Sequence, residues 1–207
     1  MQRVRYGVWS LPRLFGNCAA PDREESVPPP TGFSPGYYLR LAFDIVRWDD
    51  VAIRRASRDA NALYYGVALS ATGAAIIFLG TMLPRWLTRP ATSPASLVFE
   101  LILGLMIFWV YMGAVAIVQL SLCHLLAKWF FGATGSYLGV MRPLLLTWFV
   151  NCLILIPFVG ILTAGIAWTA VLMMVFEEVD GVGRMQAFLI SAGINVAFVV
   201  AQLLLRP

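Results

Sequence analysis

The chain has 207 residues, of which 60% are hydrophobic and 13% are charged, and its mean hydropathy is +0.79. This composition lies far from that of soluble globular domains and indicates an integral membrane protein. The net charge of +4 does not indicate a nucleic-acid partner, because nine of the 15 basic residues precede the first long apolar run and are interleaved with seven acids. The partner that the composition predicts is the lipid bilayer.

The N-terminal part of the chain divides into a tail and a helix. Residues 1–38 contain the stretch APDREESVPPPTGFSP, whose proline and polar content is typical of a flexible cytosolic tail. Residues 39–60 are predicted to form an amphipathic helix next to the membrane. Its apolar stripe consists of Leu41, Ile45, Trp48 and Ala52. Two interpretations of this helix remain open: it lies on the membrane surface, or it packs against loops of the bundle.

Five apolar runs follow, and we read each as a membrane span, although the third and fourth are short for a bilayer. We place the spans at residues 62–83, 93–126, 143–156, 160–177 and 185–205. The predicted fold class is therefore all-α, a polytopic helical membrane bundle with five transmembrane helices over residues 61–207.

The third and fourth spans come from one uncharged run, which reaches from Leu144 to Phe176 and contains 33 residues. A single helix of that length would extend about 50 Å, whereas the hydrocarbon core of a bilayer is about 30 Å thick. Pro157 lacks a backbone donor, and Gly160 adopts conformations that other residues avoid. The sequence therefore predicts that the run folds back between these two residues. Ahead of it, Ser136 is predicted to cap a short turn of helix.

The distribution of lysine and arginine near the span ends predicts the orientation. With the N-terminus inside, eight basic residues lie on the inner side: Arg40, Arg47, Arg54, Arg55, Arg58, Lys128, Arg142 and Arg184. Three lie on the outer side: Arg85, Arg89 and Arg206. This asymmetry favours a cytoplasmic N-terminus and a C-terminus outside.

Four polar residues lie within the predicted spans, where an unsatisfied group is costly: Glu100, Gln119, Asn151 and Asn195. Glu100 is either a structural carboxylate near the outer interface, in reach of water or Arg89, or a group that handles ions or protons. The three amides either form hydrogen bonds between helices or line the path of a polar substrate. A transport role therefore remains open.

Three acidic residues, Glu177, Glu178 and Asp180, gather at the cytosolic end of the fourth span, where the helix dipole disfavours negative charge. The first interpretation is local pairing with Arg142, Arg184 or the basic segment that contains Arg54, Arg55 and Arg58. The second is a basic partner protein. In either case these residues form the candidate cytosolic partner surface.

The only histidine, His124, has no second histidine to form a metal site, and the acidic residues lie elsewhere in the sequence. It is read as an interfacial histidine, with a ligand or proton-relay role as the alternative. No nucleophile elbow, zinc-protease motif or phosphate-binding glycine loop occurs. The sequence therefore predicts a protein that is not an enzyme, with no catalytic residue, no metal and no cofactor.

Small residues recur every four positions in the first and the fifth span, a spacing that lets helices approach closely. They are Gly66, Ser70 and Ala74 in the first span, and Gly193, Ala197 and Ala201 in the fifth. Such faces pack within one protomer or between protomers, so a homo-oligomer remains open.

Three segments, in this order, resemble the bacterial branch of the Yip-domain family. They are RDANALYYG before the first span, FFGATGSYLGVMRPLLL between the second and third, and FEEVDGVGRMQAF between the fourth and fifth. The resemblance covers residues 48–205 and implies five helical spans, a cytosolic N-terminus and a bacterial inner membrane. Eukaryotic relatives are linked to vesicle trafficking and Rab-type GTPases. Their Asp-Leu-Tyr-Gly-Pro motif has no counterpart here, which argues against a Rab-type partner.

The expected function is that of a non-enzymatic membrane scaffold or adaptor in membrane organisation or trafficking. It would present its N-terminal segment and inner loops to protein partners. The alternative is a small transporter or channel subunit that uses the intramembrane polar residues.

Overall fold

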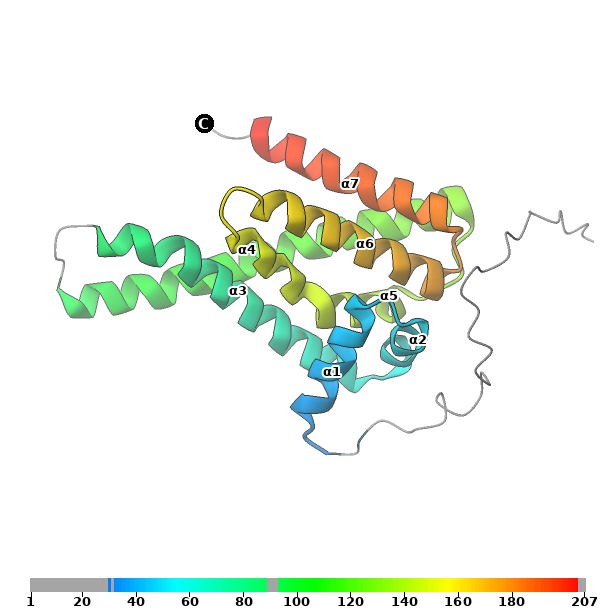
Figure 1. Ribbon diagram of the computed structural model, residues 1–207, viewed down its shortest axis with the longest axis horizontal. Coiled ribbons are helices and arrows are strands. Elements are labelled where there is room, and N and C mark those ends of the chain that lie inside the picture. The colour runs from blue at the N-terminus through cyan, green and yellow to red at the C-terminus, as the bar shows by residue number, and fades with distance from the viewer. Residues whose placement is uncertain (1–29, 31, 89–92, 205–207) are drawn as a thin grey trace, which may run out of the picture.

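The computed structural model describes residues 30, 32–88 and 93–204, and these residues form helices and connecting turns without a strand. The helices in chain order are α1 (Pro35–Val46), α2 (Asp50–Arg58), α3 (Asn61–Leu87), α4 (Pro94–Phe131), α5 (Tyr137–Thr147), the 3-10 helix η1 (Trp148–Leu155), α6 (Gly160–Asp180) and α7 (Arg184–Leu204). Five stretches are long and apolar enough to cross a membrane: α3, α4, α5 with η1, α6 and α7. The all-α fold with five candidate spans is confirmed (Figure 1). The predicted tail lies outside the described residues except for 30 and 32–38, the last four of which begin α1.

The uncharged run folds back as predicted. Its third-span helix ends at Leu155, Ile156 is extended, and α6 begins at Gly160. Between them Phe158 has a positive φ of 65°, an unusual conformation for a bulky residue. A side chain at Gly160 would clash with the carbonyl oxygen of Ile154, so the tight return requires glycine there.

The third span begins earlier than the predicted residue 143. The side chain of Ser136 accepts a hydrogen bond from the backbone N–H of Gly139 (3.1 Å), and the helix that it caps continues without interruption through Pro143. The predicted short turn and the predicted third span are therefore one element. Similarly, the fourth span ends at Asp180, where Gly181 adopts the left-handed conformation that terminates many helices.

An eight-residue 3-10 helix completes the third span. A 3-10 helix rises about 2.0 Å per residue, compared with about 1.5 Å in an α-helix. The 19 residues from Tyr137 to Leu155 therefore reach about 32 Å, rather than about 28 Å as a pure α-helix. The stretched geometry lets a short segment cross the apolar core of a bilayer.

Three glycines, spaced seven residues apart, bring α3 close to the third span. A methyl group built on Gly66 would lie 2.7 Å from Cβ of Leu145. At Gly73 it would lie 3.3 Å from the ring of Trp148, and at Gly80 it would lie 2.7 Å from a methyl group of Leu155. Positions seven residues apart share one face of a helix. Because the three glycines have no side chains, the third span can approach α3 closely along this face. We call Gly66, Gly73 and Gly80 the glycine strip.

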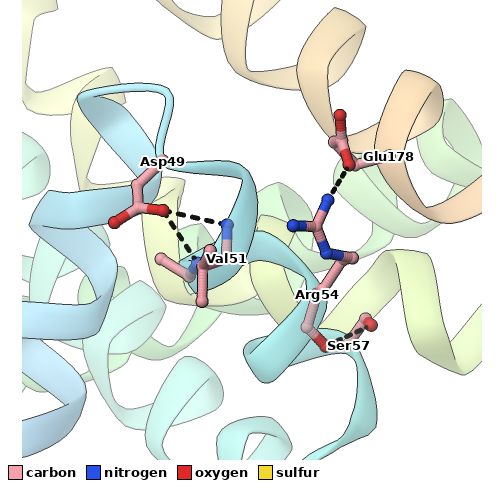
Figure 2. Close-up of polar contacts among 6 residues, drawn as sticks. Asp49, Val51, Arg54, Ser57 and Glu178 are labelled. Atoms are coloured by element: carbon pink, nitrogen blue, oxygen red, sulfur yellow. Dashed lines mark hydrogen bonds and ion pairs between the residues drawn. The ribbon is translucent and has the colours of Figure 1, made fainter. Parts of the chain in front are cut away.

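The predicted single amphipathic helix over residues 39–60 is wrong, because the structure contains two helices. The chain turns at Trp48, whose φ is +68°, and Asp49 then caps α2 by accepting a hydrogen bond from the N–H of Val51 (2.9 Å; Figure 2). Leu41 and Ala52 of the expected stripe are buried against the bundle, whereas Trp48 is 55% exposed. The stripe apart from Trp48 thus packs on protein, as the second of the two interpretations stated.

The α3–α4 hairpin is the longest part of the molecule. Helix α4 has 38 residues, which corresponds to about 57 Å, and it continues past the predicted end of the span to Phe131. The joined ends of α3 and α4 project beyond the turn between η1 and α6 (Figure 1). Most of α4 is exposed along its length, so the bundle holds this helix at few points.

We expect a larger side chain in the glycine strip to lower the stability of the protein. In Gly66→Leu the new side chain meets the backbone and Cβ of α5, and over-packing of this kind costs about 1–3 kcal/mol. The matched control is Gly193→Leu, because an added Cβ at Gly193 has no neighbour within 4 Å. Thermal unfolding of the purified protein in mild detergent should show a lower Tm for the first variant only. Equal Tm values for the two variants would contradict the close packing.

The fold-back predicts the sidedness of three exposed positions. Single cysteines at Leu138, Phe158 and Met185 should be introduced into a background in which Cys18, Cys123 and Cys152 are alanine. All three sites are exposed, and the first and third lie at the same end of the bundle. A membrane-impermeant thiol reagent should label positions 138 and 185 from one side and position 158 from the other. A different pattern would rule out the arrangement of α5, η1 and α6.

Candidate functional site

The ends of the five candidate spans meet two surface helices at one end of the bundle. Helix α2 packs on α5 and α6, and α1 packs on α2, α5 and the start of α3. The last turns of α4 and α6 and the first turns of α5 and α7 complete this end (Figure 1). We call it the cap. It contains the candidate partner surface that the sequence predicted.

An ion pair joins α2 to the end of α6. Nη1 of Arg54 lies 2.6 Å from Oε2 of Glu178, and the side chains are 34% and 19% exposed (Figure 2). A second pair joins Nε of Arg184 to Oε2 of Glu177 at 2.8 Å. Local pairing of these two acids with Arg184 and with the basic segment is therefore confirmed.

Arg142 was one of the candidate partners of the acids, but it does not form an ion pair with them. Its Nη1 donates a hydrogen bond to the carbonyl oxygen of Ser57 at 2.7 Å. This contact satisfies a carbonyl in the last turn of α2, where helix carbonyls have no partner within the helix. Arg142 thereby attaches α5 to α2 by a charge-assisted bond and not by an ion pair.

Asp180 pairs with the histidine instead of with an arginine. Its Oδ2 lies 3.1 Å from Nδ1 of His124, and Asp180 is only 1% exposed. The expectation that the acids lie away from His124 is therefore wrong. The two residues are 56 positions apart, so no local pattern could have revealed the pair.

The loop before α5 closes over this His–Asp pair. The N–H of Thr134 donates to the carbonyl oxygen of Asp180 at 3.1 Å, and any side chain at Gly135 would clash with the Asp180 carboxylate. The ring of Tyr137 packs edge-on against His124, with the ring centroids 5.7 Å apart. Within the described part of the chain, no group of three or more His, Cys, Asp or Glu side chains is placed to hold a metal ion.

Aromatic residues fix α1 to the start of α3, a feature that the sequence analysis missed. The hydroxyl of Tyr38 donates to Oδ2 of Asp59 at 2.7 Å, and its ring stacks on Tyr65 at 4.0 Å. Burial and the hydrogen bond to Asp59 both raise the pKa of Tyr38 above its usual value, so the phenol stays neutral. Tyr65 in turn accepts a hydrogen bond from the N–H of Ser34 (2.9 Å).

Two of the four intramembrane polar residues meet. Nε2 of Gln119 donates to Oδ1 of Asn195, and Nδ2 of Asn195 donates to Oγ1 of Thr169 at 2.6 Å. Thr169 then donates to the carbonyl oxygen of Gly165 at 2.7 Å. This network links α4, α7 and α6, as expected for amides that satisfy one another in lipid. The sequence analysis did not name Thr169 among the intramembrane polar residues.

The other two polar residues lie apart from this network. Asn151 donates to the carbonyl oxygen of Trp148 within η1, at 2.9 Å. Glu100 is exposed on α4, about 28 Å along the helix from Gln119. The four residues therefore do not line one path. The small-residue faces also differ, because Gly66 packs inside the bundle whereas Gly193 faces open space.

A comparison with models of known protein families found no match, and comparisons with curated proteins and with solved structures found no significant match. The resemblance to the Yip-domain family accordingly stays a prediction from the sequence. The class that the fold defines is a five-span helical membrane protein with a folded cap at one end.

We expect the ion pair between α2 and α6 to stabilise the cap. Arg54→Glu places two negative charges together and should lower the free energy of unfolding by about 1 kcal/mol, the upper range for a partly exposed pair. The double variant Arg54→Glu, Glu178→Arg should regain most of that loss. Arg58→Glu, at an exposed position of the same helix, is the control. A double variant that is no more stable than Arg54→Glu would contradict the pairing.

Proposed function

We propose that this chain is a non-enzymatic membrane scaffold of the Yip-domain type, which presents its cap to a protein partner at the cytosolic face of a bacterial inner membrane. The excess of lysine and arginine at the cap supports this orientation, with the N-terminus inside and the C-terminus outside. Away from the cap, the five candidate spans carry few charged residues. This composition suits a membrane domain that anchors the cap.

The observation that carries the proposal is that the glutamates of the cap are paired within the chain, whereas several of its arginines are exposed. Glu177 and Glu178 form ion pairs with arginines of the chain, and Asp180 hydrogen-bonds His124. The two glutamates therefore do not need a basic partner protein to neutralise them. The arginines at positions 40, 47 and 58 are instead exposed, on α1, directly after α1 and on α2 respectively. The apolar side chains of Leu39 and Phe43 on α1 are exposed as well.

A surface that combines exposed arginine with apolar side chains fits an acidic partner segment with apolar anchors. Arginine and aromatic residues are enriched where proteins bind one another. The ion pair of α2 and the tyrosine contacts of α1 hold this surface in one conformation, so a partner would not need to order it. The chemistry of the cap therefore supports an adaptor that binds an acidic protein segment.

The transport alternative receives less support. A path for ions or polar solutes needs polar groups that follow one another across the membrane. Gln119 and Asn195 hydrogen-bond each other, and Glu100 lies far along α4 from both. Flux through reconstituted protein that is lost in Glu100→Gln would nevertheless favour this alternative.

The scaffold proposal predicts that one end of the molecule selects partners. In cells, we expect cross-linking and copurification to recover the same cytosolic protein from the wild type and from Arg85→Glu, whose exposed site lies at the opposite end. The triple variant Arg40→Glu, Arg47→Glu, Arg58→Glu should lose that protein while it keeps the wild-type Tm. Recovery that is unchanged in the triple variant would contradict the assignment of the cap as the binding surface.

A further inference from the structure

A groove runs between α3 and α4, and the third span forms its floor. Near the hairpin end α3 and α4 touch, because Gly104 packs on the ring of Phe78. Towards the cap, α4 instead packs on α7, and it leaves α3. The space between them has a volume of about 460 Å³. Its lining includes Ser70, Ala74, Gly113, Ala116, Leu145 and Trp148.

Small residues create this groove, and it is partly open at its side. A Cβ added at Gly113 would have no neighbour within 4 Å, although the glycine lies in the middle of α4. Ser70 uses its hydroxyl for the carbonyl oxygen of Val67 at 2.9 Å, so the lining offers no free donor there. Since the groove lies within the candidate spans, its opening faces the hydrocarbon region.

The groove is large enough for one acyl chain. If a methylene group is similar in size to a water molecule, at about 30 Å³, the groove holds about 15 of them. A groove that is open at its side also accepts part of a helix from a second copy, so the groups at its cap end decide between these two occupants.

Polar and basic groups lie at the cap end of the groove. Ser121 comes directly after the lining residue Leu120 on α4, and Tyr137 lies one turn before the lining residue Met141 on α5. The hydroxyls of Ser121 and Tyr137 lie 3.1 Å apart. Lys128 is exposed two turns beyond Ser121 on the same side of α4. An amphiphile whose chain enters the groove thus meets hydroxyls and then a positive charge. That order matches an anionic phospholipid.

We propose that this groove binds one acyl chain of an anionic phospholipid from the leaflet on the cap side, with the headgroup at Ser121, Tyr137 and Lys128. The site is independent of the scaffold function, because it uses none of the exposed arginines of α1 and α2. The protein then retains a lipid at a defined position between α3 and α4, while lipids elsewhere around the bundle exchange freely.

Trp148 provides the readout, because it lines the groove and is only 6% exposed. The other tryptophans are replaced by phenylalanine, and the full chain is reconstituted in phosphatidylcholine vesicles. A low mole fraction of phosphatidylglycerol brominated on its acyl chains should quench Trp148 at least twofold more than brominated phosphatidylcholine at the same fraction. Equal quenching by both lipids, or no quenching, overturns the proposal.

A matched pair of glycine variants locates the site. Gly113→Leu fills the groove, whereas Gly165→Leu adds the same side chain at another open helical position that is not part of the lining. Only Gly113→Leu should abolish the quenching, and Lys128→Gln should remove the preference for the anionic lipid. Quenching that survives in Gly113→Leu overturns the proposal.

Native mass spectrometry repeats the comparison on the chain with all its tryptophans, in case the single-tryptophan protein does not fold. One retained phosphatidylglycerol is expected for the wild type and for Gly165→Leu, and none for Gly113→Leu. A lipid-free dimer that Gly113→Leu dissociates would identify a second copy as the occupant and overturn the proposal.

Discussion

The close contact between α3 and the third span is the interaction on which the rest of the fold depends. In lipid there is little hydrophobic driving force between helices, so their association relies on van der Waals packing and hydrogen bonds. The glycine strip supplies that packing from Leu145 to Leu155 of the third span. The other elements are built on this pair, because α1 and α2 pack on α5, and α6 packs on η1 after the tight return at Gly160.

Polar groups then select one arrangement among many that apolar packing allows. An unsatisfied amide or carboxylate is costly in a bundle that excludes water, so each such group restricts the helices that bring it a partner. The Gln119–Asn195–Thr169 network does this within the spans, and the His124–Asp180 pair does it beneath the cap. Both connect α4 to helices that follow it in the chain. The position of α4 is therefore set by hydrogen bonds more than by burial.

The weak burial of α4 links the groove to the cap. Because α4 contacts α3 near the hairpin end and the groove separates them towards the cap, the two helices diverge where the groove opens. The same divergence brings the end of α4 to the ends of α6 and α7, where its histidine meets Asp180. The divergence of α3 and α4 thus accounts both for the apolar groove and for the position of the end of α4 in the cap.

The sequence by itself determined the features that depend on local composition. The length of the apolar runs required five candidate spans, and an uncharged run of 33 residues had to fold back because a bilayer is too thin for it. Pro157 and Gly160 marked the place, and Ser136 marked the start of a helix. Each of these signals acts within a few residues, so no knowledge of neighbouring helices was needed.

Only the tertiary structure decided the features that depend on how helices cross. The third span begins at Tyr137 and stretches into a 3-10 helix, and the surface segment breaks at Trp48. The partners in the cap are 124 residues apart for Arg54 and Glu178 and 56 apart for His124 and Asp180. Charge and hydrophobicity show that such groups need partners, but many pairings satisfy that need equally well. The choice among them is geometric, because it follows from the directions in which packed helices place their ends.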